Sequence, residues 1–150
     1  MHKIKVYQAV ILIAAVSVPF REARSADVLP LDLPTQVAGI ETVCTGESLD
    51  LRRDARWNDY ALKIEFAGPG GQYVGGEEVS VGQTGKTILN VECPGPWLLL
   101  QLPPGRYDVS AKLGGQTAQS AAFVSKRGQG HIILRFLGEM LAVLDSAKGR

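Results

Sequence analysis

Leu102-Pro103-Pro104-Gly105-Arg106-Tyr107-Asp108-Val109 is the stretch that decides the fold class of this chain. Two prolines fix their φ angles and the glycine after them adopts turn conformations freely, which is typical of a tight turn between strands. An apolar run precedes the turn, and alternating apolar and polar side chains follow it. A tyrosine placed directly after such a turn can bury its ring and return its hydroxyl group to a nearby backbone group, as in the tyrosine corner of β-sandwiches. We therefore expect a β-sandwich in which Tyr107 holds the turn.

Short apolar segments separated by turn residues make up most of the chain after residue 59. Leu62, Ile64 and Phe66 alternate with polar residues, the period-2 pattern of a half-buried strand. Further strands are predicted at 72–74, 78–81, 87–92, 97–102, 106–113, 117–125 and 131–136. Their spacing of about 8 to 12 residues predicts a single, about seven-stranded, antiparallel β-sandwich over residues 59–137.

A glycine dipeptide and a leucine tripeptide add detail to the predicted strand arrangement. Gly114-Gly115 is typical of a hairpin turn between the two strands that flank it. Leu98-Leu99-Leu100 is apolar on both faces, so this strand is either central and covered on both sides or part of an interface with another molecule.

The first 25 residues have the three parts of a secretory signal peptide. A basic segment with Lys3 and Lys5 precedes an apolar run over 6–20, and Ala23 and Ser25 place small residues at a cleavage site before Ala26. The apolar run is shorter than the roughly 20 residues that a spanning helix needs. We expect cleavage before Ala26, localisation in the periplasm or outside the cell, and no membrane span after cleavage. An uncleaved N-terminal anchor is the alternative.

The charge of the predicted mature chain is close to neutral. Removing residues 1–25 takes away four basic residues and one acidic residue, which leaves 12 of the 16 basic and 14 of the 15 acidic residues, a net charge of about −2. Nucleic-acid binding and binding to an anionic membrane surface require a basic patch that this composition does not supply. We therefore expect neither.

The chain has two cysteines, Cys44 and Cys93, both in the predicted exported part. In an oxidising compartment two thiols most simply form a disulfide, here one that closes a loop of about 50 residues. Two separately buried free thiols are the main alternative. Redox or metal chemistry is a weaker one, because the cysteines are far apart in sequence and form no Cys-x-x-Cys motif.

The segments that flank the predicted sandwich have weaker patterns. Residues 26–58 read as an N-terminal arm, with an extended, Pro- and Gly-punctuated part up to Thr45 and a possible short helix over 47–58. Ser48 is the candidate N-cap of that helix. The C-terminal tail, residues 138–150, has an apolar patch that fits a helical turn covering the sandwich, a disordered extension, or a segment that docks on a partner.

Three stretches together resemble a known domain family. Residues Asp59 to Phe66, Gly95-Pro96-Trp97 and Leu102 to Val109 are similar to the carboxypeptidase regulatory-like domain, a transthyretin-like (prealbumin-type) β-sandwich. The resemblance covers roughly residues 39–136 and points to a group of small, stand-alone, exported bacterial proteins. The better-known members of the family are non-catalytic domains fused to an enzyme or a receptor. The resemblance therefore implies an accessory role.

The residue types that carry chemistry are scarce. His131 is the one histidine of the predicted mature chain, and its place in the strand pattern directs it to solvent, away from Ile132. Glu77, Glu78, Glu92 and Asp108 do not have the spacing of a calcium loop, and we expect them on solvated strand faces. We predict no catalytic residue, no metal site and no cofactor.

Aromatic residues are the candidates for a binding surface, because their faces stack on sugars and anchor protein interfaces. Trp57 and Tyr73 lie in irregular stretches and are expected to be exposed, whereas Trp97 begins a strand and is expected to pack in the core or at its rim. The predicted function is protein–protein interaction in the cell envelope, through an exposed sheet edge or the face of Leu98 to Leu100. The alternative is a carbohydrate- or small-ligand-binding module that uses Trp57, Tyr73 and Trp97.

Overall fold

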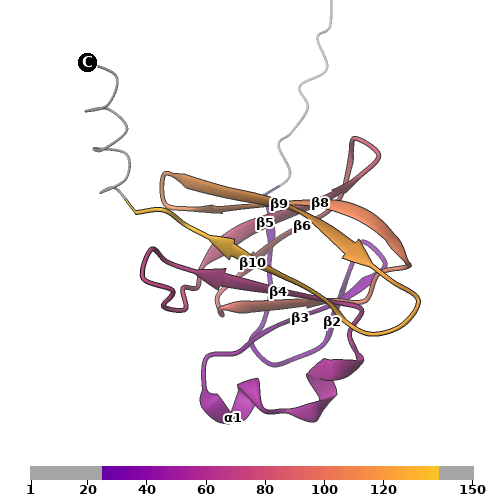
Figure 1. The fold of residues 1–150 in the computed structure, drawn as a ribbon, viewed down its shortest axis with the longest axis horizontal. Helices are drawn as coiled ribbons and strands as arrows, with labels where there is room; N and C mark the ends of the chain where they lie inside the picture. The colour runs from indigo at the N-terminus through magenta and orange to yellow at the C-terminus, as the bar shows by residue number, and fades with distance from the viewer. Residues whose placement is uncertain (1–24, 139–150) are drawn as a thin grey trace, which may run out of the picture.

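The computed structural model describes residues 25–138, which form two five-stranded sheets packed face to face (Figure 1). Sheet A has the strand order β1 (Asp27–Val28), β6 (Lys86–Cys93), β5 (Glu77–Gln83), β8 (Gly105–Leu113) and β9 (Gln116–Val124). Sheet B has the order β10 (Gly130–Arg135), β4 (Leu62–Ala67), β7 (Trp97–Leu100), β3 (Ile40–Thr45) and β2 (Thr35–Val37). The all-β sandwich is confirmed. The predicted signal peptide and almost all of the C-terminal tail lie outside the described residues.

The prediction of seven antiparallel strands was wrong in two respects. The described residues contain ten strands, and two pairs are parallel: β1 with β6, and β10 with β4. The short loop after β9 carries the chain from sheet A to sheet B. A short hairpin loop makes two strands antiparallel partners only when both lie in the same sheet. Since β10 and β9 lie in different sheets, the loop between them does not force antiparallel pairing. The strand β10 pairs instead with β4 of sheet B, and the two run parallel.

The predicted N-terminal arm is part of the sandwich. Residues 26–45 supply β1, β2 and β3, and β3 pairs in antiparallel register with the central strand β7, with Val43 opposite Leu99. The second part of the arm forms two short helical segments, α1 (Leu49–Arg52) and the 3₁₀ turn η1 (Ala55–Asp59). The predicted N-cap is confirmed, since the Ser48 hydroxyl oxygen accepts a hydrogen bond from the Leu51 amide.

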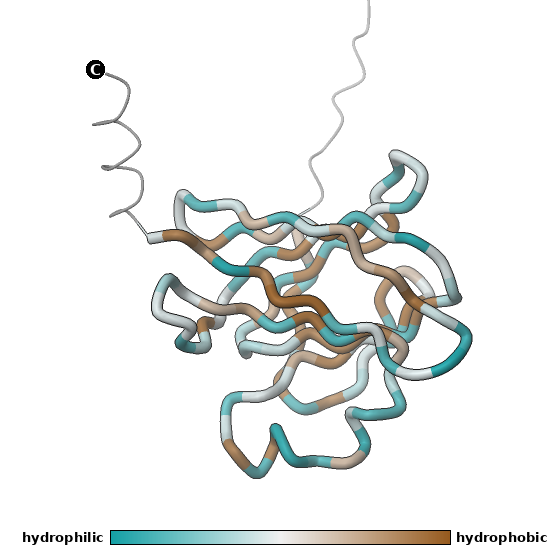
Figure 2. Tube along the Cα trace, in the orientation of Figure 1, coloured by the Kyte–Doolittle hydropathy of each residue, from teal (hydrophilic) through white to brown (hydrophobic). Residues whose placement is uncertain are grey.

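The main core lies between the two sheets. Leu62, Ile64 and Phe66 of β4 point into it and are fully buried, as the alternating pattern predicts. On β10, Leu134 is buried and Ile132 packs against the same core. Figure 2 shows brown, apolar stretches along β10 and neighbouring strands, whereas the loops are largely pale or teal.

A second, smaller core lies on the outer face of sheet B. It contains five buried residues: Val43, Trp57, Tyr60, Trp97 and Leu99. The segment with α1 and η1 covers this face (Figure 1), so Leu98, Leu99 and Leu100 are all fully buried. Of the two alternatives for this run, the central, doubly covered strand is confirmed. The expectation that the face of Leu98 to Leu100 serves as an interface was wrong, because the chain itself covers it.

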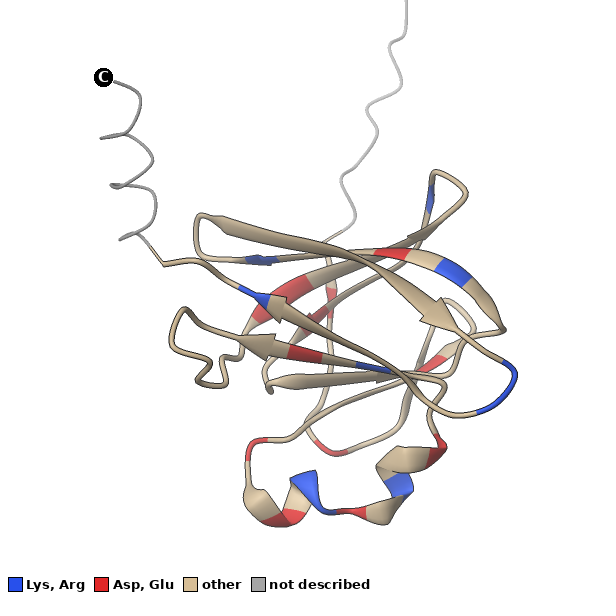
Figure 3. Cartoon of the chain, in the orientation of Figure 1, with Lys and Arg blue, Asp and Glu red and all other residues tan. Residues whose placement is uncertain are grey.

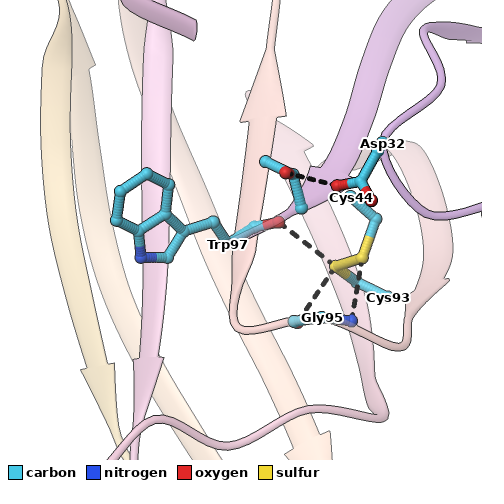
Figure 4. Close-up of a disulfide and its surroundings, with 6 residues drawn as sticks. Asp32, Cys44, Cys93, Gly95 and Trp97 are labelled. Atoms are coloured by element: carbon cyan, nitrogen blue, oxygen red, sulfur yellow. Dashed lines mark hydrogen bonds between the residues drawn. A yellow bond between two sulfur atoms is a disulfide. The ribbon is translucent and has the colours of Figure 1, made fainter. Parts of the chain in front are cut away.

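A disulfide joins the two sheets. Cys44 on β3 and Cys93 on β6 are both fully buried, with an S–S distance of 2.06 Å, so the predicted pairing is confirmed. The turn after Cys93 wraps around the sulfur atoms (Figure 4): the Gly95 amide donates a hydrogen bond of 3.0 Å to Cys44 Sγ. Cys93 Sγ lies 3.3 Å from the Gly95 carbonyl oxygen, a close contact and not a donated bond, since a disulfide sulfur has no proton.

Candidate functional site

The first predicted binding residue, Trp57, is a structural residue of the small core. Its side chain is 3% exposed, and its indole N–H donates a 2.8 Å hydrogen bond to the carbonyl oxygen of Leu51. The guanidinium of Arg56 lies 4.8 Å from the ring centroid and covers it. The expectation that Trp57 is exposed was therefore wrong: its polar neighbours in η1 face the solvent while the ring folds back under α1.

Trp97 is buried as expected, and neighbouring groups occupy its ring. The ammonium of Lys63 lies 4.1 Å from the ring centroid, which is a cation–π contact. Gly46 packs against the same side chain, since a Cβ atom at that position would lie 2.8 Å from Trp97 Cγ. The indole nitrogen is buried and has no hydrogen-bond partner among the described residues. With 6% of Trp97 exposed, little of the ring remains for stacking on a ligand.

Tyr73 is the exposed member of the three predicted binding residues. Its side chain is 45% exposed, it meets Trp97 edge-on at 6.3 Å between ring centroids, and the guanidinium of Arg52 lies 4.9 Å from its ring. The structure thus brings Tyr73 and Trp97 together on the outer face of sheet B, next to the cations of Arg52 and Lys63. Trp57 belongs to a different contact, with Tyr60.

A row of ionisable side chains continues this face along β4 and β10. Glu65 Oε1 lies 3.0 Å from Lys63 Nζ and 3.4 Å from Nε2 of His131. The His131 side chain is 44% exposed, so its predicted orientation to solvent is confirmed. Figure 3 shows that acidic and basic residues are mixed over the molecule without a large region of one sign. Such a surface has no strong field to concentrate an oppositely charged ligand.

The flank formed by β9 and β10 is the second candidate surface. These are the edge strands of sheet A and sheet B, and they lie side by side (Figure 1). At the loop between them Gly130 is close to the carbonyl oxygen of Phe123, 2.5 Å from where a Cβ atom would stand. Phe123 on β9 is 66% exposed and Ile133 on β10 is 46% exposed. We call this surface, with Leu137 at its end, the β9–β10 edge.

The strand β9 has no charge or proline to protect its edge, although the start of β10 covers the backbone of its C-terminal end at Phe123. Within the described residues its one partner strand is β8, with which all nine residues pair in register. Its sequence, Gln116–Val124, contains no charged residue and no proline. Natural proteins commonly place lysines, prolines or bulges on exposed edges to stop another strand from pairing there. Away from the end that Gly130 covers, the backbone of β9 therefore offers an uncharged template to an added strand.

Glu77 is a residue that the sequence reasoning misplaced. It was expected on a solvated strand face, but it is fully buried, and neither carboxylate oxygen has a hydrogen-bond partner among the described residues. The strand pattern did indicate the buried position: Glu77 alternates in step with Val79 and Val81, whose side chains point inward from β5. The usual surface position of glutamate outweighed this pattern.

The described residues contain neither a cluster of metal ligands nor a membrane-spanning helix. Among residues 25–138, no three His, Cys, Asp or Glu side chains lie close enough together to hold a metal ion. No helix in the described part of the chain is long and apolar enough to cross a membrane. Comparison of the sequence with protein-family models gave no match, and comparison with curated proteins gave none.

Proposed function

We propose that this protein is a non-catalytic accessory module of the cell envelope that binds another protein along the β9–β10 edge. The observation that carries the proposal is the edge strand β9: nine residues, uncharged, and paired on one side within the described residues. An extended segment of a partner can add to such an edge by main-chain hydrogen bonds, while side-chain contacts give specificity. Phe123, 66% exposed, supplies an aromatic anchor at the end of the strand.

Two further observations support this assignment. The sequence resembles the carboxypeptidase regulatory-like domain, whose better-known examples are accessory domains, and the β-sandwich fits that resemblance. The buried Cys44–Cys93 disulfide suits an oxidising compartment, as does the predicted signal peptide. Periplasmic or secreted localisation is therefore part of the proposal.

The experiment is site-specific photo-crosslinking in the native cell. A photoreactive amino acid replaces Phe123 on the edge, and in a matched chain it replaces Thr87, an exposed residue of the inner strand β6. The proposal expects one protein to be captured repeatedly from position 123 and not from position 87. Adding Gln119→Lys to the edge strand should abolish this capture, because a charged edge opposes strand addition. Equal capture from both positions, or none above background from position 123, contradicts the proposal.

The carbohydrate-binding alternative now depends on Tyr73. Trp57 and Trp97 are buried, so of the three predicted binding residues only Tyr73 combines an exposed ring with a neighbouring cation, Arg52. Titration of the protein with cell-envelope glycans, followed by tyrosine and tryptophan fluorescence, tests this alternative. A saturable change that Tyr73→Ala removes would favour it over the β9–β10 edge.

A further inference from the structure

Glu77 is the one charged residue among the buried residues that the structure describes. It begins β5, points into the sandwich with Val79 and Val81, and lies opposite Cys93 in the antiparallel register. Side chains opposite each other on one face of an antiparallel pair have Cβ atoms about 5 Å apart. The side chain of Glu77 therefore starts next to that of Cys93, and it is fully buried at the end of the interior that holds the disulfide.

No partner compensates the burial of this carboxyl group. Both oxygens lack a hydrogen bond, and Glu77 forms no ion pair among the described residues. The charged neighbours in register, Glu92 and Lys112, pair with exposed Glu78 and so lie on the opposite face of sheet A. On sheet B, Lys63 and Glu65 contact each other on the outer face.

Asp32 also lies near the disulfide (Figure 4), and its carboxyl group has a partner of its own. Its Oδ1 accepts a 2.6 Å hydrogen bond from the Thr45 hydroxyl group. Burial of an ionised carboxylate without a partner is costly, so the closed structure favours the protonated form of Glu77. Desolvation accordingly raises the pKa of Glu77 from its usual 4.5 to about 8. The residue's own backbone N–H, which does not meet the geometry of a hydrogen bond to either oxygen, lowers the pKa by a smaller amount.

The backbone near Glu77 is closely packed at Gly75 and at Gly95, whereas Gly76 has open space beside it. The Gly76 amide donates a 2.8 Å hydrogen bond to the carbonyl oxygen of Cys93. A Cβ atom at Gly75 would lie 2.1 Å from the Pro94 carbonyl oxygen, and one at Gly95 would lie 2.7 Å from that of Thr45. Residues 75–77 and 93–96, with Cys44, form a unit that we call the cystine end. In the closed structure Glu77, Cys44 and Cys93 are all fully buried, so solvent reaches the carboxyl group and the disulfide only after an opening of the fold.

We propose that Glu77 makes opening of the cystine end depend on its proton: protonated Glu77 keeps this end closed over the disulfide, and loss of the proton to water favours an open form in which the disulfide is accessible. The open form hydrates the carboxylate and returns its pKa towards 4.5. By proton linkage the opening equilibrium then rises by up to about tenfold per pH unit between pH 5 and pH 8, and levels off above. Access to the disulfide follows the same curve.

Reduction kinetics test this proposal. A water-soluble trialkylphosphine reduces the disulfide; the phosphine gives two electrons and takes an oxygen atom from water, whose two protons go to the sulfur atoms. The rate for the folded protein is measured from pH 5 to pH 9 and divided at each pH by the rate for the same protein unfolded in urea. This ratio removes the pH dependence of the phosphine itself.

The expected result is a ratio that rises at least tenfold between pH 5 and pH 8 in the wild type. Glu77→Gln keeps the side-chain size but cannot ionise, so its ratio should change less than twofold over this range. Glu78→Gln is the matched control, since its neighbouring carboxyl group is exposed, and it should behave as the wild type does. A flat ratio in the wild type, or a parallel rise in Glu77→Gln, overturns the proposal.

Hydrogen exchange of the wild type gives a second test that needs no variant. The Gly76 amide reports opening of the cystine end through its bond to Cys93, and the Leu98 amide reports a central strand of sheet B. After correction for intrinsic exchange, the protection of Gly76 should fall between pH 5 and pH 8 by the same factor as the reduction ratio rises. An unchanged protection factor at Gly76 overturns the proposal even if Glu77→Gln does not fold.

Discussion

The hydroxyl group of Tyr107 donates a 2.6 Å hydrogen bond to the carbonyl oxygen of Pro103. The bond closes the turn that links β7 to β8, and the tyrosine ring is 1% exposed. The expected tyrosine corner is thus confirmed. Removing the hydroxyl group in Tyr107→Phe leaves the ring packing intact and deprives a partly buried carbonyl group of its partner.

We expect Tyr107→Phe to lower the free energy of unfolding by about 1–2 kcal/mol, the usual effect of losing one such bond. Urea denaturation followed by tryptophan fluorescence measures it. Tyr73→Phe is the control, because the exposed Tyr73 makes no hydrogen bond through its hydroxyl group within the described residues, and it should change stability by less than about 0.5 kcal/mol. Equal effects of the two variants would show that the Pro103 bond does not stabilise the fold.

The disulfide closes a loop between residues separated by 49 positions. In the chain-entropy model such a cross-link stabilises the folded state by about 4 kcal/mol, mainly by restricting the unfolded chain. The double variant Cys44→Ala, Cys93→Ala should lose a stability of that order in urea denaturation. A loss below about 1 kcal/mol would contradict this account.

Substitutions at Gly46 and Gly39 distinguish the cost of backbone strain from the cost of overpacking. Both have positive φ angles, +93° and +78°, but only at Gly46 would a Cβ atom meet Trp97, whereas at Gly39 it would meet nothing within 4 Å. Gly39→Ala should cost about 1 kcal/mol, and Gly46→Ala should cost a further 1–3 kcal/mol or so from overpacking. Thermal unfolding of both variants checks the difference, and equal melting temperatures would contradict the contact with Trp97.

The buried carboxyl group of Glu77 should make the free energy of unfolding depend on pH. Burial raises its pKa to about 8 in the folded state, so between about pH 4.5 and pH 8 the folded protein holds a proton that the unfolded chain has released. Stability from this group is therefore full below pH 4.5 and falls, by roughly a few kcal/mol, as the pH rises to about 8. Urea denaturation at pH 5, 7 and 9 should show this fall in the wild type. If Glu77→Gln shows the same fall, another group is responsible.

The local pattern of the sequence predicted the strands with strong alternation well. β4, β8 and β10 were placed to within about two residues, because their side chains must divide between the core and the solvent. Pairing between distant segments leaves no local pattern, so the parallel partnership of β10 with β4 could not be predicted. β1 and β2 have two and three residues, too few for a periodicity to emerge.

The candidate site was predicted less well than the fold. Tyr73 and Trp97 lie together as a candidate site requires. The ring of Trp97 is covered, however, by Lys63 and Gly46, which come from other parts of the chain. The exposure of Trp57 was misjudged because its neighbours are polar. The β9–β10 edge could not be recognised, since being at an edge is a property of strand order and not of the strand's own residues.

The pairing of β10 with β4 joins segments that are more than sixty residues apart, with Gly130 opposite Leu62. Such a contact forms only after a long loop has closed, and chains that depend on distant pairings fold slowly, typically in milliseconds to seconds. Until β10 arrives, β4 has an open edge beside an unfinished core. The time that β10 takes to dock is therefore a period in which the newly synthesised chain is accessible to chaperones and proteases and can aggregate with other copies of itself.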